Sequence, residues 1–299
     1  GFHYVEAYRS RKMDVNAFVR NFSFFFSNGM DPEYGVMGRV ARRIWAIAMR
    51  DLYKAGDRAQ KFKYHIQSSG RSLHAQEFTY NDYRTVLQAQ YAIQDAANSL
   101  HTNSRDEAFG TPTEDTVRDA QAIQMILNME YGWNQCENPL QGSFWVEHLT
   151  NMVEEQVLQI FEEISRRGGV EGAIETDYQR NRIQQESIEY EHKKHDGSYP
   201  IVGVNTFIDE ESNDQLSVEN FNMEVTRSSP EERDEIIKEL KKFKKKHAKE
   251  SPEAIARLKE VALSGGNIME ELMHSVKVCS LGEITEALFE CGGKFRRNM

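Results

Sequence analysis

The chain has 299 residues, of which 39% are hydrophobic and 28% charged, so one large domain or two ordinary ones can form a sizeable core. Its 37 basic and 47 acidic residues give a net charge of −10, which disfavours a general nucleic-acid-binding surface. The three cysteines are widely spaced and form no CxxC pair, which excludes a disulfide framework and a cysteine zinc site. No run of about 18 apolar residues occurs, which excludes a membrane span. The start, GFHYVEAYRSRKMDV, has no leader pattern, and we expect a cytoplasmic chain that is a piece of something longer.

The first 131 residues alternate between helical and strand patterns. Apolar residues at helical spacing predict helices over 1–20, 33–53, 80–97 and 113–131. Buried or alternating stretches predict strands over 21–29, 61–70 and 99–103. This order predicts an α/β fold with a parallel sheet, either doubly wound or part of a (β/α)8 barrel. No GxGxxG follows a strand and no GxxxxGK[ST] occurs, which disfavours the nucleotide-binding versions.

The remaining residues are mostly helical. We expect helices over 147–167, 170–194, 230–249, 252–263 and 267–290, with a short strand-like piece within 195–207 and a polar linker over 208–229. Ser229-Pro230 and Ser251-Pro252 are typical helix starts, with proline at the first helical position. The chain is therefore predicted to divide into segments 1–135, 136–207, 208–229 and 230–299.

Each predicted strand ends in polar residues, within the stretches SFFFSNG, YHIQSSG and SLHTNSRDE. In a barrel, the loops after the carboxyl ends of the strands carry the chemistry. Glu107 could act there as an acid, a base or a hydrogen-bond acceptor for a ligand, or it could be an ordinary solvated carboxylate. His65 and Gln67 lie on one face of their strand, where they need either a ligand or an internal hydrogen-bond network.

Two other patterns have ordinary explanations that we favour. His192 and His195 are three residues apart and could hold a metal, but EYEHKKHDG reads better as an exposed helix end. The basic stretch 238–250 could bind nucleic acid or anionic lipid, but a solvated helix face explains it better because acidic residues flank it. We therefore expect no metal site, no nucleic-acid binding and no membrane binding.

Four longer stretches resemble the adenosylcobalamin-dependent acyl-CoA mutase family, which includes the methylmalonyl-CoA mutases. They are FSFFFSNGMDPEYGVMGRVARRIWA, KYHIQSSGRSLHAQE, NSLHTNSRDEAFGTPTEDTVRDA and NPLQGSFWVEHLT. Three shorter segments are closer to the isobutyryl-CoA mutase branch, in which a G-protein domain is part of the same polypeptide. They are FFFSNGMDPEY, YEHKKHDG and the terminal GGKFRRNM. The resemblance implies the last three βα units of a (β/α)8 TIM barrel, preceded by one helix and followed by a mostly helical carboxyl-terminal region.

The resemblance also implies roles for individual residues. Gln67 and Glu107 match catalytic positions that face the corrin and the adenosyl ribose of the cofactor, and Asn21 stands where methylmalonyl-CoA mutases have arginine. The positions that match acyl-CoA contacts are Ser23, Arg58, Lys63 and His65. The positions that match contacts to the G-domain nucleotide are Glu175 and Asn298.

The reaction implied is the interconversion of isobutyryl-CoA and n-butyryl-CoA. It would use adenosylcobalamin, with GTP and Mg2+ bound mainly by domains outside this chain. We expect cobalamin and GTPase domains as partners, an acyl-CoA substrate, a homodimer, and no activity from the chain alone. The alternatives are methylmalonyl-CoA or another acyl-CoA as substrate, or a non-catalytic module whose helices dock a G-domain.

Overall fold

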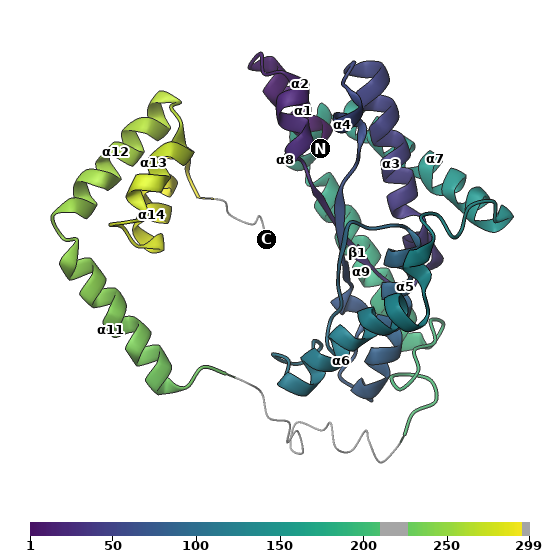
Figure 1. Cartoon of the computed structure of the whole chain (residues 1–299). Coiled ribbons are helices and arrows are strands. Elements are labelled where there is room, and N and C mark those ends of the chain that lie inside the picture. The colour runs from purple at the N-terminus through teal and green to yellow at the C-terminus, as the bar shows by residue number, and fades with distance from the viewer. Residues whose placement is uncertain (210–226, 295–299) are drawn as a thin grey trace. The chain divides into compact units, whose positions relative to one another are not determined.

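The computed structural model describes residues 1–209 and 227–294, and the chain divides into two compact units, Gly1–Thr226 and Arg227–Met299 (Figure 1). The first unit contains the strands β1 (Phe24–Asn28), β2 (Tyr64–Ser68) and β3 (Ser99–His101). Its helices are α1 (Phe2–Ser10), α2 (Val15–Phe18), α3 (Met37–Ile47), α4 (Asp57–Gln60), α5 (Asn81–Gln94), α6 (Glu114–Met125), α7 (Phe144–Arg166), α8 (Gly169–Glu175) and α9 (Tyr178–Asp196).

The three strands form one parallel sheet in the order β1-β2-β3. Helices follow the strands as predicted: α3 follows β1, α5 follows β2 and α6 follows β3. The arrangement is three consecutive βα units of an α/β barrel, followed by a helical region, which confirms the predicted fold class. Within the described residues, the outer edges of β1 and β3 pair with no further strand.

The two faces of the sheet differ in burial. Tyr64 and Ile66 of β2 are buried and pack with Ala92 of α5, while the rings of Phe24 and Phe62 stack at 4.2 Å on the same side. On the opposite face Phe25 is 58% exposed. The helices therefore cover one face, and the other face carries the alternate residues of each strand.

A buried ionic cluster joins α3 to the end of α5. Asp95 accepts hydrogen bonds from the Gly38 backbone N–H at 2.6 Å and from Arg42 at 3.1 Å. Tyr64 donates to the Asp95 carbonyl at 2.7 Å. A Cβ on Gly38 would lie 2.0 Å from the Tyr64 hydroxyl, so only glycine allows this close packing of helix against strand.

The helix ends follow local sequence signals. Thr113 caps α6 in a capping box with Thr116, as the sequence predicts. Gly168 follows α7 at φ +91°. The single helix predicted over 170–194 is wrong in one respect: it is divided into α8 and α9, because Asp177 adopts φ +52° and interrupts the helical hydrogen bonds.

The second unit contains α11 (Pro230–Lys246), α12 (Glu250–Ser264), α13 (Ile268–Ser275) and α14 (Leu281–Gly292), around a core that includes Leu258 and Ile284. Ser229 caps α11 with Pro230 in the first turn, as predicted. The predicted start at Ser251-Pro252 is wrong, because α12 begins at Glu250 and Ser251 is buried inside its first turn.

The predicted final helix over 267–290 is also wrong as a single element. It is two helices, because Ser280 caps α14 through a capping box with Glu283 and ends the preceding segment. In the part of the chain that the structure describes, no helix is both long and apolar enough to cross a bilayer.

Candidate functional site

The exposed face of the sheet carries several of the predicted site residues in register. Ser23 and Lys63 immediately precede β1 and β2 and lie at the same level, since the Phe24 N–H donates to the Lys63 carbonyl at 2.9 Å. The strand pairing then aligns Phe25 with His65 and Ser99, and Ser27 with Gln67 and His101. With about 3.3 Å of rise per residue, Lys63 and Gln67 lie roughly 13 Å apart along β2.

The middle of this face is formed by His65 and its two cross-strand neighbours. His65 Nδ1 lies 2.8 Å from the Ser99 hydroxyl, and its ring stacks on Phe25 with the ring centroids 5.4 Å apart. These contacts fix the imidazole plane along the sheet. Sequence reasoning placed His65 on this face but missed Phe25, whose exposed ring is unusual for a strand in a folded core.

The amino end of the sheet holds the predicted cations. Lys63 immediately precedes β2, and its Nζ donates a hydrogen bond to the Arg20 carbonyl at 2.5 Å. Arg58 is exposed on α4, five residues before Lys63. Lys63 is therefore at the opposite end of β2 from Gln67, and Arg58 lies on the short helix that precedes that end of the strand.

At the carboxyl end, Gln67 is tied to the loop that follows β3. Its Nε2 donates to Asn103 Oδ1 at 2.9 Å. Asn103 is 1% exposed and donates in turn from Nδ2 to the Ser68 carbonyl and from its backbone N–H to Ser68 Oγ, both at 2.8 Å. The sequence shows these residues as a polar loop but does not reveal this pairing.

The carboxylate of Asp106 organises the rest of this loop. It accepts hydrogen bonds from the hydroxyls of Ser104 and Thr116 and from the Thr113 N–H. Burial alone would raise the pKa of Asp106, but these hydrogen bonds outweigh it and lower the pKa. Asp106 therefore acts as a charged anchor inside the strand-to-helix connection.

Glu107, the next residue, has the opposite environment. It is exposed, and its carboxylate makes no hydrogen bond or ion pair with any residue in 1–209 or 227–294. A Cβ on Gly70 would lie 3.6 Å from Glu107 Cγ and 3.7 Å from Asn103 Nδ2, so the loops after β2 and β3 touch at this glycine. The structure thus brings Gln67 and Glu107 to adjacent strand ends, and Glu107 lines a cavity of about 250 Å3 together with His101 and Gln124.

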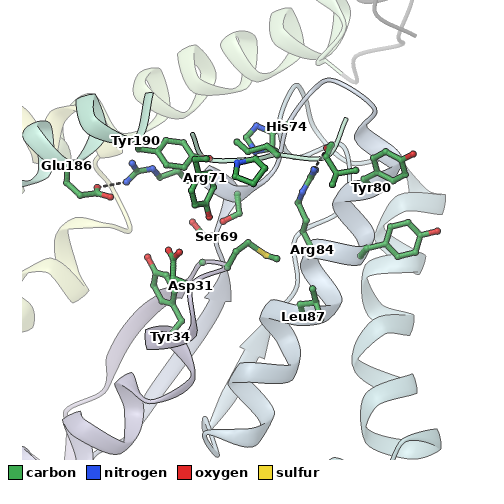
Figure 2. A pocket seen from close by; sticks show the side chains of 18 residues that line it. Asp31, Tyr34, Ser69, Arg71, His74, Tyr80, Arg84, Leu87, Glu186 and Tyr190 are labelled. Atoms are coloured by element: carbon green, nitrogen blue, oxygen red, sulfur yellow. Dashed lines mark hydrogen bonds and ion pairs between the residues drawn. The ribbon is translucent and has the colours of Figure 1, made fainter. Parts of the chain in front are cut away.

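A larger pocket of about 400 Å3 lies beyond the carboxyl ends of β1 and β2 (Figure 2). Arg71, directly after Gly70, donates to Glu186 at 2.6 Å and lies 4.5 Å from the centre of the Tyr190 ring. Arg84 donates to the Val202 carbonyl at 2.6 Å. Sequence reasoning missed this pocket, because residues 186–202 reach it from more than 100 positions away.

His74 also lines this pocket. Burial lowers the pKa of His74 to about 4, and the positive charges of Arg84 and Lys194 act in the same direction. The side chain is therefore neutral at physiological pH. Among the described residues, no group of three or more histidine, cysteine, aspartate or glutamate side chains is arranged to hold a metal ion.

Three of the remaining predicted residues lie on the helices α8 and α9 and not on the strands. Glu175 is exposed at the end of α8, and Asn298 lies outside the described residues. His192 and His195 lie near the end of α9, where His195 Nε2 is 4.0 Å from Glu191. Among the described residues, no hydrogen bond or ion pair joins Glu175, His192 or His195 to Gln67 or Glu107.

Comparison with known proteins gives consistent matches. A family model described as methylmalonyl-CoA mutase matches residues 1–294. All of this chain aligns with fused isobutyryl-CoA mutases, at 58% identity for Geobacillus kaustophilus and 56% for Cupriavidus metallidurans, and it covers 27% of each. It is 32% identical over its whole length to the human mitochondrial methylmalonyl-CoA mutase, of which it covers 40%. The chain therefore spans about a quarter of the length of the fused relatives it matches.

Proposed function

The chain belongs to the methylmalonyl-CoA mutase family, and we propose that it is the carboxyl-terminal part of the substrate domain of an enzyme that interconverts isobutyryl-CoA and n-butyryl-CoA. The identity of 56–58% to fused isobutyryl-CoA mutases, against 31–32% to mammalian methylmalonyl-CoA mutases, favours this substrate. The alternative substrate is methylmalonyl-CoA, and Asn21, which stands where methylmalonyl-CoA mutases have arginine, also favours the isobutyryl branch.

One observation carries the proposal: Lys63 and Gln67 lie at opposite ends of one exposed sheet face, and the loop beside the Gln67 end carries Glu107, which has no hydrogen-bond partner among the described residues. Lys63 and Arg58 would bind the phosphates of CoA, since arginine and lysine form charge-assisted hydrogen bonds with phosphate. The thioester arm would run along Phe25 and His65 toward Gln67. A span of roughly 13 Å between Lys63 and Gln67 suits an extended arm rather than a compact ligand.

The residues at the carboxyl end fit the adenosyl group of adenosylcobalamin. Glu107 offers two carboxylate oxygens that have no donor among residues 1–209 and 227–294, and they can accept hydrogen bonds from both hydroxyls of a ribose. When bound, this cofactor supplies the organic radical that the rearrangement requires. Glu107 would hold the ribose, Gln67 would line the same space, and the neighbouring side chains would exclude water from the reacting carbons.

We further propose that the complete protein is a cytoplasmic homodimer coupled to a GTPase domain with its GTP and Mg2+. The relatives described as fused are about four times as long as this chain, which supports further domains in the same polypeptide. Glu175 and Asn298 are the residues of this chain that we assign to the nucleotide. The competing reading is a docking module without catalytic residues. Such a module would have no use for an unpaired carboxylate beside Gln67.

The substitution Glu107→Gln in the full-length protein tests this function. It keeps the shape of the side chain but removes its charge, and a hydrogen bond to a charged acceptor contributes about 1.5–3 kcal/mol. If that bond strengthens as the cobalt–carbon bond breaks, turnover should fall roughly tenfold to a hundredfold. Acyl-CoA binding should change little, because Lys63 and Arg58 bind the phosphates.

Stopped-flow loss of the alkylcobalamin absorbance after mixing with substrate is the measurement, and it should be slower or smaller in the variant. Glu114→Gln is the matched control, since Glu114 is also an exposed carboxylate near the start of α6. Its kinetics should equal those of the wild type. Normal bond cleavage in Glu107→Gln would make Glu107 an ordinary solvated carboxylate.

A further inference from the structure

We propose that Asn103 is a positioning residue that holds the side-chain amide of Gln67 in a single orientation, an inference that rests on the proposed role of Gln67. Asn103 is 1% exposed, so it is shielded from solvent and from a ligand on the open face. Its contacts are with Gln67 and Ser68, the last two residues of β2. Its effect on the site therefore passes through Gln67.

The orientation follows from which groups can donate. The carbonyl of Ser68 can only accept, so the group that faces it at 2.8 Å must be the Nδ2 of Asn103. That assignment turns Asn103 Oδ1 toward Gln67, and an oxygen requires a donor opposite it. Gln67 must then present Nε2, at 2.9 Å, and cannot present its oxygen. One backbone carbonyl thus fixes the orientation of two side-chain amides in series.

This chain of hydrogen bonds leaves Gln67 Oε1 without a donor among the residues that the structure describes. The carboxylate of Glu107, on the adjacent loop across Gly70, also lacks a donor there. The end of β2 and the neighbouring loop after β3 therefore each present an acceptor oxygen, and Asn103 determines that Gln67 presents Oε1 rather than Nε2. A ligand with two or more hydroxyl or N–H donors fits this pair, as a ribose does.

The backbone of Asn103 strengthens the arrangement. Its N–H donates to Ser68 Oγ, so both the main chain and the side chain of Asn103 are tied to the same residue of β2. Ser68 is 1% exposed, and its bonds are protected from water. Because buried hydrogen-bond networks are costly to leave partly unsatisfied, this network resists rotation of either amide.

A double-mutant cycle in the full-length protein tests the proposal. Gln67→Ala, Asn103→Ala and the double variant are compared for turnover and for the rate of alkylcobalamin absorbance loss. We expect about a tenfold loss in Gln67→Ala, a loss no larger in Asn103→Ala, and no further loss in the double variant. Independent losses that multiply in the double variant would overturn the proposal, because Asn103 would then act on the reaction directly.

A readout that needs no cofactor is the crystal structure of cofactor-free Asn103→Ala. The Gln67 side chain should occupy more than one rotamer there, and a single unchanged orientation would contradict the proposal. The matched control is Asn81→Ala, a buried amide that bonds to His74 and Arg105 but not to Gln67. Its effect should multiply with that of Gln67→Ala.

If Asn103→Ala does not fold, Asn103→Leu replaces it in the cycle. Leucine has nearly the same shape but can neither donate to the Ser68 carbonyl nor accept from Gln67, so the same loss of Gln67 order and the same absence of a further loss in the double variant are expected. The outcome for Gln67→Ala alone separates the two ideas. Unchanged bond cleavage in that variant would refute the proposed role of Gln67, whereas a tenfold loss with multiplicative Asn103 effects would refute only the role of Asn103.

Discussion

The two ends of the three-stranded sheet are built in opposite ways. At the amino end, Arg58 is exposed on a four-residue helix, and Lys63 has one hydrogen bond, to a backbone carbonyl. At the carboxyl end, Ser68, Asn103 and Asp106 are each at most 4% exposed and are fully engaged in hydrogen bonds. One end presents cations with few hydrogen bonds, and the other presents a buried network of short polar side chains.

The difference matches what each end has to do. Attraction between cations and phosphates acts over distance and tolerates flexible side chains. Guiding a reactive group requires acceptors held within about 0.5 Å of their working positions, which only a buried supporting network provides. The contrast therefore predicts that substitutions at the amino end weaken binding, whereas substitutions at the carboxyl end slow the reaction.

The largest expected effect comes from separating this chain from the rest of its protein. Three parallel strands cannot close a barrel, so the face that carries both ends remains open to water. Purified residues 1–299 with added adenosylcobalamin should show no measurable isomerisation of isobutyryl-CoA, by chromatographic assay of the acyl-CoA products. Measurable turnover would show that neither end needs further strands around it.

The next largest effect is expected at the amino end. In the full-length protein, Arg58→Ala and Lys63→Ala should each raise KM for the acyl-CoA about tenfold, because each removes a charge-assisted hydrogen bond partly screened by solvent. The double variant should raise it about a hundredfold if the two residues act independently. Turnover at saturating substrate should be nearly unchanged.

Steady-state kinetics at two salt concentrations measure this effect, which should shrink as salt screens the cations. Arg50→Ala is the matched control, because Arg50 is also exposed but is already paired with Asp51. A fall in kcat with an unchanged KM would erase the distinction between the two ends.

The sequence predicted the elements better than the contacts between them. Alternation in KFKYHIQSSG correctly indicated β2 and its two faces, and Thr113 correctly indicated the start of α6. The signal SLGE at 280–283 has the capping-box spacing and could have revealed the break before α14. Ser251-Pro252 gave a wrong start for α12, because proline is tolerated throughout the first turn of a helix and does not mark its first residue.

The site could be predicted only in part, for a physical reason. A polar loop after a strand indicates where chemistry can lie, which made Glu107 a candidate, and the alternation along β2 made Gln67 another. Long-range hydrogen bonds decide which polar side chains become buried supports of the site. The bond between Asn103 and Ser68, for example, joins residues 35 positions apart. Local sequence does not record that register, so Asn103 and Asp106 gave no signal that distinguished them from Glu107.

The smallest expected effect concerns how the carboxyl end depends on pH. His74, six residues beyond β2, is buried and has a pKa lowered to about 4, mainly by burial and further by Arg84 and Lys194, with Glu191 opposing. In an unfolded chain its pKa would be about 6.5. Between these two values the unfolded state binds a proton that the folded state does not, so stability falls as the pH falls from 6.5 towards 4.

For a fall from pH 6.5 to 4.5, this group alone should lower the free energy of unfolding by about 2 kcal/mol. His74→Gln in the full-length protein should lack that part of the pH dependence, since the bonds from Asn81 reach only the His74 backbone. Calorimetry of both proteins at the two pH values measures the difference, and NMR of 13C-labelled histidine should find one ring that titrates near pH 4. Such a result would show that acid weakens the buried carboxyl end while the exposed cations of the amino end keep their charge. An identical pH slope in the wild type and the variant would mean that His74 gains its proton without opening the fold, and the carboxyl end would then be less rigid than its hydrogen bonds indicate.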